Sequence, residues 1–143
     1  MKAFDYLNQI KKMDAKINND IEELASLQAL ATKTTSALGG NIVKASGSQQ
    51  KMADCVVKIA ELKKAIDTEV DVYVDYKNQV KQLIHTACDA DCCRLLYLRY
   101  FKFDTWESVA AEIGCSYQWA AGRLHRKALA QVQKKLDELK KNS

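Results

Sequence analysis

The chain has 143 residues, of which 48% are hydrophobic and 28% charged, with a formal net charge of +4. This hydrophobic share is enough for a folded core and excludes a chain that is disordered by composition. No segment approaches the roughly 20 apolar residues that a membrane-spanning helix needs, and the N-terminal residues lack the apolar run of a signal peptide. Proline is absent and glycine is scarce, so little opposes long helices. We therefore expect a soluble, cytoplasmic, all-α protein without a membrane partner.

The first part of the chain predicts a helical hairpin. Over about residues 3–31 and 49–86, apolar residues recur at alternating steps of three and four, as they do along helices that pack lengthwise on one another. The intervening residues 32–48 are rich in Ser, Thr and Gly and predict a long loop. We expect an antiparallel hairpin as a domain over residues 1–86. Its long apolar seams would also suit pairing with a second copy of the chain.

The remaining residues 87–143 predict a smaller helical domain. The segment Asp89-Ala90-Asp91 offers an N-cap for a short, mostly apolar helix that runs from Cys92 to Phe101. This helix precedes a further pair of helices, which carry the chemistry.

The pair consists of a helix, a tight turn and a longer helix. Thr105 is a suitable N-cap for a helix over residues 106–113, and Gly114 ends this helix as a left-handed residue usually does. Ser116 caps the next helix, which runs from Tyr117 to at least Val132. This order of elements is typical of a helix-turn-helix that holds its second helix out for the major groove of DNA.

Helical phase separates the inner and outer faces of the second helix. The residues expected to point inward are Tyr117, Ala121, Leu124, Ala128 and Val132. Gln and Arg side chains on the outer face can make bidentate contacts with adenine and guanine, and lysines further along can meet phosphates. The candidate DNA-binding residues are Ser116, Gln118, Trp119, Arg123, His125, Arg126, Lys127 and Lys134. Packing on the hairpin remains an alternative for Trp119, and local capping or packing an alternative for His125.

Charge is distributed unevenly along the chain. Residues 1–85 hold 12 lysines and 11 acidic residues, whereas residues 86–143 hold 10 basic and 7 acidic ones. No acidic residue lies between Ile113 and Leu136, a stretch with two arginines and three lysines. Such a stripe suits a polyanion such as DNA, although a plain solvated helix face could carry the same charges.

Metal binding and catalysis find little support in the sequence. His85, Cys88, Cys92 and Cys93 have the spacing H-x2-C-x3-C-C, but zinc needs four ligands in a tetrahedron and no fourth is apparent when neighbouring cysteines point apart. We expect all five cysteines to be reduced thiols. With two histidines and no strand followed by a glycine-rich loop, we expect no enzyme, no cofactor and no small-molecule substrate.

Several segments carry a family resemblance. They are residues 95–100 (Leu-Leu-Tyr-Leu-Arg-Tyr), 105–110 (Thr-Trp-Glu-Ser-Val-Ala), 113–116 (Ile-Gly-Cys-Ser) and 124–129 (Leu-His-Arg-Lys-Ala-Leu). They resemble the sigma-factor domain that reads the −35 promoter element (region four), and more closely the phage and prophage late-transcription regulators of the ArpU/RinA-like group. Residues 6–10 and 47–52 of the hairpin also look like that group. The spacing from Ser116 to Ala128 and Leu129 is one residue longer than the usual pattern.

The resemblance implies a DNA-binding transcription regulator of phage or prophage origin, which recognises promoter-like DNA through the helix starting at Tyr117. An alternative hypothesis is a protein-interaction module that binds RNA polymerase or a sigma factor with little sequence-specific DNA contact. The small residues Ala120, Ala121 and Gly122 early in the helix favour this alternative. In a third hypothesis, the hairpin builds a homodimer and the basic helix only tethers it to nucleic acid.

Overall fold

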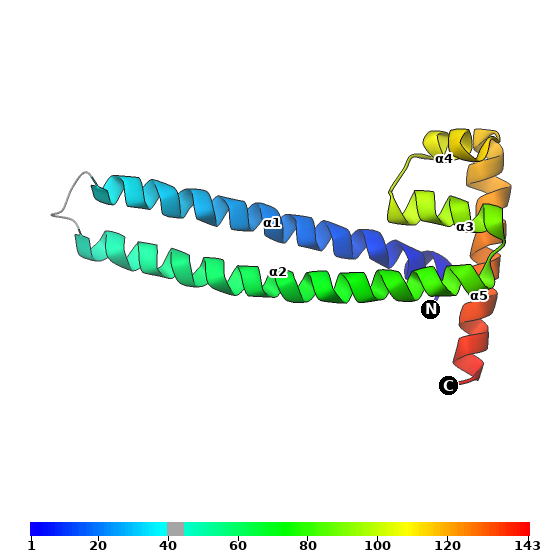
Figure 1. Ribbon diagram of the computed structural model, residues 1–143, viewed down its shortest axis with the longest axis horizontal. Coiled ribbons are helices and arrows are strands. Elements are labelled where there is room, and N and C mark those ends of the chain that lie inside the picture. Colours follow the sequence, from blue (N-terminus) through cyan, green and yellow to red (C-terminus); the bar gives the residue numbers. More distant parts are fainter. Residues whose placement is uncertain (40–44) are drawn as a thin grey trace. The chain divides into compact units, whose positions relative to one another are not determined.

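The computed structural model describes residues 1–39 and 45–143, with side chains described for residues 1–33 and 49–143 (Figure 1). The described chain is helical and contains no strand, which confirms the predicted all-α class. Its elements are α1 (Ala3–Gly39), α2 (Ala45–Ala87), α3 (Ala90–Leu96), the π-helical η2 (Tyr97–Phe101), α4 (Trp106–Ile113), the π-helical η3 (Trp119–Leu124) and α5 (His125–Lys141). Among these described residues, no helix is long and apolar enough to span a bilayer.

Both long helices extend into the segment that the sequence predicted as a loop. α1 continues to Gly39 instead of ending near residue 31, and α2 begins at Ala45. The hydroxyl of Thr32 donates to the carbonyl of Gln28, one turn earlier, at 3.0 Å. Through this bond the Thr32 hydroxyl is satisfied by the backbone of its own helix, so this polar residue lies within the helix without ending it. The rest of the expected loop, residues 40–44, lies outside the described residues.

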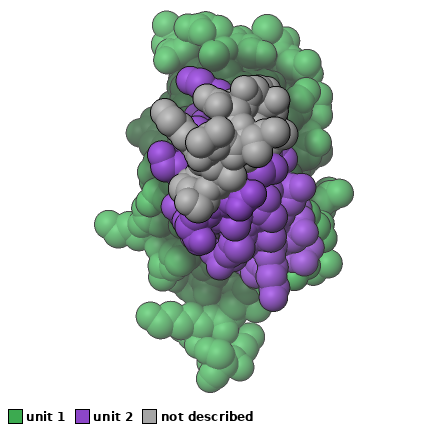
Figure 2. Space-filling view, turned by 90° about the vertical axis from the view of Figure 1, so that its left-hand side faces the viewer, with its two compact units in different colours: residues 1–13, 73–143 green, residues 14–72 purple. Residues whose placement is uncertain are grey.

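The chain divides into two compact units, which Figure 2 distinguishes by colour. Unit 1 comprises residues 1–13 and 73–143, and unit 2 comprises residues 14–72. The sequence predicted a domain boundary after residue 86, whereas the boundary of the units crosses both long helices. The reason is that apolar side chains from the beginning of α1 and the end of α2 belong to the same hydrophobic cluster as those of the C-terminal helices.

Unit 2 contains stretches of α1 and α2 with a narrow apolar seam. Among the side chains of this unit that the structure describes, the buried hydrophobic ones are Ile17, Cys55 and Ile66. The ammonium of Lys16 lies 3.8 Å from Oε1 of Glu69, so an early residue of α1 faces a late residue of α2. This pairing has the antiparallel sense expected of a hairpin.

Unit 1 holds the main hydrophobic core. The cluster joins the beginning of α1, the end of α2 and every later helix, and its members include Leu7, Ile10, Val80, Ile84, Leu95, Leu96, Leu98, Val109, Leu124, Ala128 and Val132. Polar contacts support the same arrangement. The Tyr76 hydroxyl donates to the Tyr6 carbonyl at 2.6 Å, and the amide of Ala3 donates to Oε1 of Gln133 at 2.7 Å. The ends of the hairpin are thus integral parts of this unit.

Three predicted N-caps are confirmed in unit 1. Asp89 accepts a hydrogen bond from the amide of Cys92 at 3.0 Å, Thr105 accepts one from Ser108 at 3.2 Å, and Ser116 accepts one from Trp119 at 3.1 Å. Each side chain satisfies one of the amides that a helix leaves unpaired in its first turn. These caps fix where α3, α4 and the helix after the turn begin.

Candidate nucleic-acid interface

A tight turn joins α4 to the last long helix. Gly114 has a φ of 83°, the left-handed conformation that the sequence predicted, and a side chain would be strained there. The amides of Gly114 and Cys115 both donate to the carbonyl of Ala110, at 2.9 and 3.0 Å. Ala110 is itself buried, so its small side chain allows close packing at this point. Helix, glycine turn and helix therefore follow one another as expected.

The inner face of the last helix differs from the predicted one. Tyr117 was expected to point inward but is 46% exposed, whereas Ala120 is completely buried and Ala121 only partly so. Leu124, Ala128 and Val132 are buried as predicted. The physical reason is the π-helical η3, whose wider turn shifts the phase of the residues before it relative to those after it.

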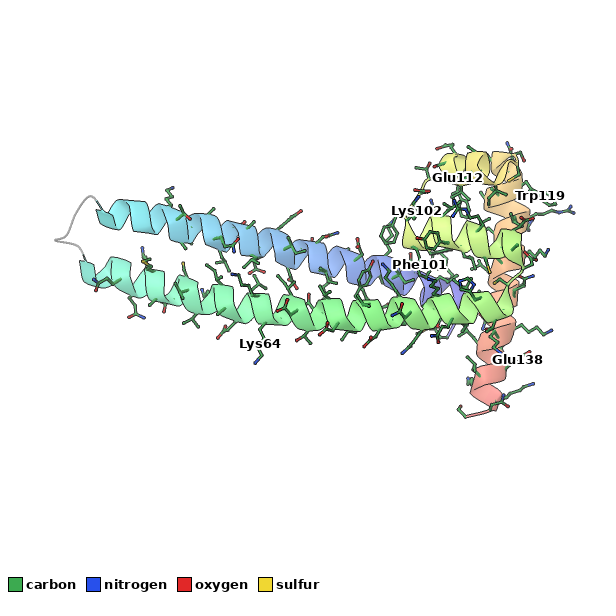
Figure 3. The ribbon with its side chains drawn as sticks, in the orientation of Figure 1. Lys64, Phe101, Lys102, Glu112, Trp119 and Glu138 are labelled. Carbon is green, nitrogen blue, oxygen red and sulfur yellow. The ribbon has the colours of Figure 1, made fainter. Side chains whose placement is uncertain are left out.

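Four of the candidate side chains lie on the outer surface of this helix. They are Gln118, Trp119, Arg123 and Arg126, and all four are exposed. Trp119 is 45% exposed and is labelled in Figure 3. The guanidinium of Arg123 lies 5.6 Å from the centre of its ring, within the range of a cation–π contact. The structure therefore brings a flat aromatic ring and two guanidinium groups together on one exposed helical segment.

The other candidates on this helix have local partners or lie further along it. The Lys127 ammonium lies 3.0 Å from Oδ2 of Asp89, which also accepts a hydrogen bond from Gln131 at 3.1 Å. The bond from the Cys92 amide, followed by those from Lys127 and Gln131, holds the pKa of the Asp89 carboxyl well below its usual range. The Ser116 hydroxyl serves as the helix cap, and Lys134 is exposed on α5. The sequence showed Asp89 only as a cap, because its partners on α5 are distant along the chain.

His125 lies among aromatic rings. Its Nε2 atom is 2.6 Å from the Tyr100 hydroxyl, and its ring is centred 5.8 Å from that of Tyr100 and 4.7 Å from that of Trp106. Burial, together with the nearby Arg99 guanidinium, lowers the pKa of His125 to about 4. The imidazole is therefore neutral at pH 7. This position favours a packing role over an electrostatic contact with DNA.

The cysteines near the α2–α3 junction are protonated thiols. Cys93 donates to the carbonyls of Ile84 and Cys88, at 3.3 and 3.4 Å. Burial raises the pKa of Cys88 and of Cys92 to about 12, so neither is a thiolate near neutral pH. Within the described residues, no three His, Cys, Asp or Glu side chains gather in a way that could hold a metal ion.

Comparison with family models, with curated proteins and with solved structures finds no match to this chain.

Proposed function

We propose that this protein is a DNA-binding transcription regulator of phage or prophage origin, which recognises promoter-like DNA through the helix beginning at Tyr117. The observation that carries this proposal is the exposed set Gln118, Trp119, Arg123 and Arg126 on a helix that follows a left-handed glycine turn. A helix-turn-helix places such side chains in the major groove, where arginine can pair with guanine and glutamine with adenine.

The pairing of charges around this helix supports the proposal. Lys127 is neutralised by Asp89, and Lys135 lies 3.9 Å from Glu138. Arg123 and Arg126, in contrast, have no carboxylate partner among the residues that the structure describes. Their charges are therefore available to a polyanion, and an exposed aromatic ring beside them offers a stacking surface for sugar or base.

The proposal is tested by replacing both arginines. A duplex bound by the protein is first selected from a random library, and its affinity is then measured by fluorescence anisotropy at several salt concentrations. We expect the Arg123→Ala/Arg126→Ala variant to bind at least about tenfold more weakly, with a shallower salt dependence. The affinity falls because each lost base contact contributes about 1–3 kcal/mol, and the salt dependence becomes shallower because each lost phosphate contact releases about one counterion fewer on binding.

The matched control is the Lys63→Ala/Lys64→Ala variant, which removes the same two charges from exposed positions of α2. We expect it to bind the selected duplex like the unmodified protein. A protein that selects no duplex, or an equal loss of affinity in both variants, would contradict the proposal.

The alternative is a protein-interaction module that binds RNA polymerase or a sigma factor. The exposed rings of Tyr117 and Trp119 favour it, because aromatic residues are enriched at protein interfaces. Capture of purified polymerase by the protein, unaffected by nuclease and lost in a Tyr117→Ala/Trp119→Ala variant, would support this alternative over direct DNA recognition.

Dimerisation through the hairpin completes the proposal. Several aliphatic side chains of unit 2 are exposed, among them Ile21, Val56, Val57, Val70 and Val72. Val56 and Val70 are separated by about four helical turns and so share a face of α2. We expect light scattering at micromolar concentration to give about twice the chain mass of 16.1 kDa. The Val56→Glu/Val70→Glu variant should give the mass of a single chain. A monomer in the unmodified protein would refute this part.

A further inference from the structure

A small pocket lies within unit 1, where α1, η2, α4 and the first residue of α5 meet. Its volume is about 260 Å³. Its aromatic walls come from Phe4, Tyr100, Phe103 and Trp106, and its polar lining includes Lys11, Arg99 and His125. No local pattern along the chain indicates this pocket, because its lining residues come from positions as distant as 4 and 125.

The pocket carries positive charge that no acid offsets. No acidic side chain lines it, and neither Lys11 nor Arg99 forms an ion pair within the described parts of the chain. Arg99 donates to the main-chain carbonyl of Asp104 at 3.0 Å, and that bond orients the guanidinium without neutralising it. The third basic group, His125, is neutral at pH 7. Two cations therefore face one small space.

The aromatic lining is held in place by its neighbours. The Arg99 guanidinium lies 4.6 Å from the centre of the Trp106 ring, and His125 contacts both Trp106 and Tyr100. Phe103 has a φ of 59°, a left-handed conformation that is sterically unfavourable for a non-glycine residue. Strain of this kind persists where the surrounding structure imposes it, and it is common at ligand sites, as are π-helical turns such as η2.

We propose that this pocket binds a small planar organic anion, an aromatic carboxylate or aryl phosphate, with its ring against the aromatic walls and its anionic group at Lys11 and Arg99. Arginine and lysine are the side chains that bind carboxylate and phosphate groups, and flat rings stack on tryptophan and tyrosine. The volume is slightly below that of pockets for drug-sized molecules, which suits a ligand with one ring.

Trp106 provides a direct measurement of binding. The chain has two tryptophans, so a Trp119→Phe variant leaves Trp106, which lines the pocket, as the only one. We titrate this variant, without DNA, with benzoate and phenyl phosphate at constant ionic strength. We expect a saturable change in tryptophan emission with both probes, and at least about tenfold weaker binding of benzamide and acetate, which lack the charge or the ring.

A pair of neighbouring lysines tests the geometry. Lys11 lines the pocket, whereas Lys12 does not, and both are exposed, so neither replacement should disturb folding. We expect Lys11→Gln, in the Trp119→Phe background, to weaken binding of benzoate about fivefold, and Lys12→Gln to leave it unchanged. No saturable response to either anion, equal binding of benzamide, or equal effects of the two lysine variants would each overturn the proposal. Because no DNA is used in the titrations, these results are independent of the proposed function.

Discussion

Replacing Leu96 by alanine is expected to lower the free energy of unfolding of unit 1 by about 3 kcal/mol, within the roughly 2–5 kcal/mol typical of such core truncations. Leu96 is completely buried in the hydrophobic cluster that joins α1, α2 and the C-terminal helices. The shortened side chain loses its transfer free energy and leaves a cavity that the surrounding helices fill only partly. Because a domain of this size is stable by only about 5–15 kcal/mol, the loss is a large part of the total.

The measurement is urea denaturation followed by tryptophan fluorescence. Both tryptophans, Trp106 and Trp119, lie in unit 1, so this signal reports on that unit and not on unit 2. The matched control is Leu139→Ala, since Leu139 is 50% exposed on α5 and should change the free energy of unfolding by less than about 0.5 kcal/mol. A similar midpoint for the two variants would show that Leu96 is not in the core.

The second large effect is a dependence of stability on pH that arises from His125. Burial lowers the pKa of His125 to about 4 in the folded protein, against an ordinary value of 6.5. Between these two values the unfolded chain binds a proton that the folded protein does not. The contribution of His125 to the free energy of unfolding is therefore fully present above pH 6.5, and it is lost as the pH decreases toward 4. Between pH 7.5 and pH 4.5 this shift corresponds to a loss of about 2–3 kcal/mol.

This loss is measured by urea denaturation at pH 7.5, 6, 5 and 4.5. A His125→Gln variant should be less stable at pH 7.5 but should lose much less stability across this range. His85→Gln serves as the control, because His85 is exposed and should leave the pH dependence unchanged. Asp89 acts mainly at lower pH, because its carboxyl begins to be protonated in the unfolded chain only near its ordinary pKa of 3.8. Parallel curves for the protein and its His125→Gln variant would refute the assignment.

Several features could be predicted from the sequence because they depend on neighbouring residues. The caps Asp89, Thr105 and Ser116 each bond to an amide three residues away, and Gly114 adopts the left-handed conformation that ends α4. Apolar spacing likewise sufficed for the all-α class. The exposed position of Arg126 also follows from helical phase, since this residue lies after η3 in the regular part of the last helix.

Local patterns were less informative where a helix departs from regular geometry. The inner face was assigned to Tyr117 and Ala121, while the structure buries Ala120, because regular α-helical phase does not hold through the π-helical η3. In addition, α1 continues beyond residue 31, and α2 begins before residue 49. Ser, Thr and Gly favour loops without requiring them.

The sequence by itself determined the helical class, the caps, the glycine turn and the basic character of the last helix. Only the tertiary structure decided which charges stay available and which are paired, as with Lys127 on Asp89. It also decided that His125 packs against Tyr100 and that Lys11 and Arg99 face one pocket. The physical reason is that caps and turns arise from contacts over a few residues. Pairing, burial and pockets depend on which distant segments the core brings together.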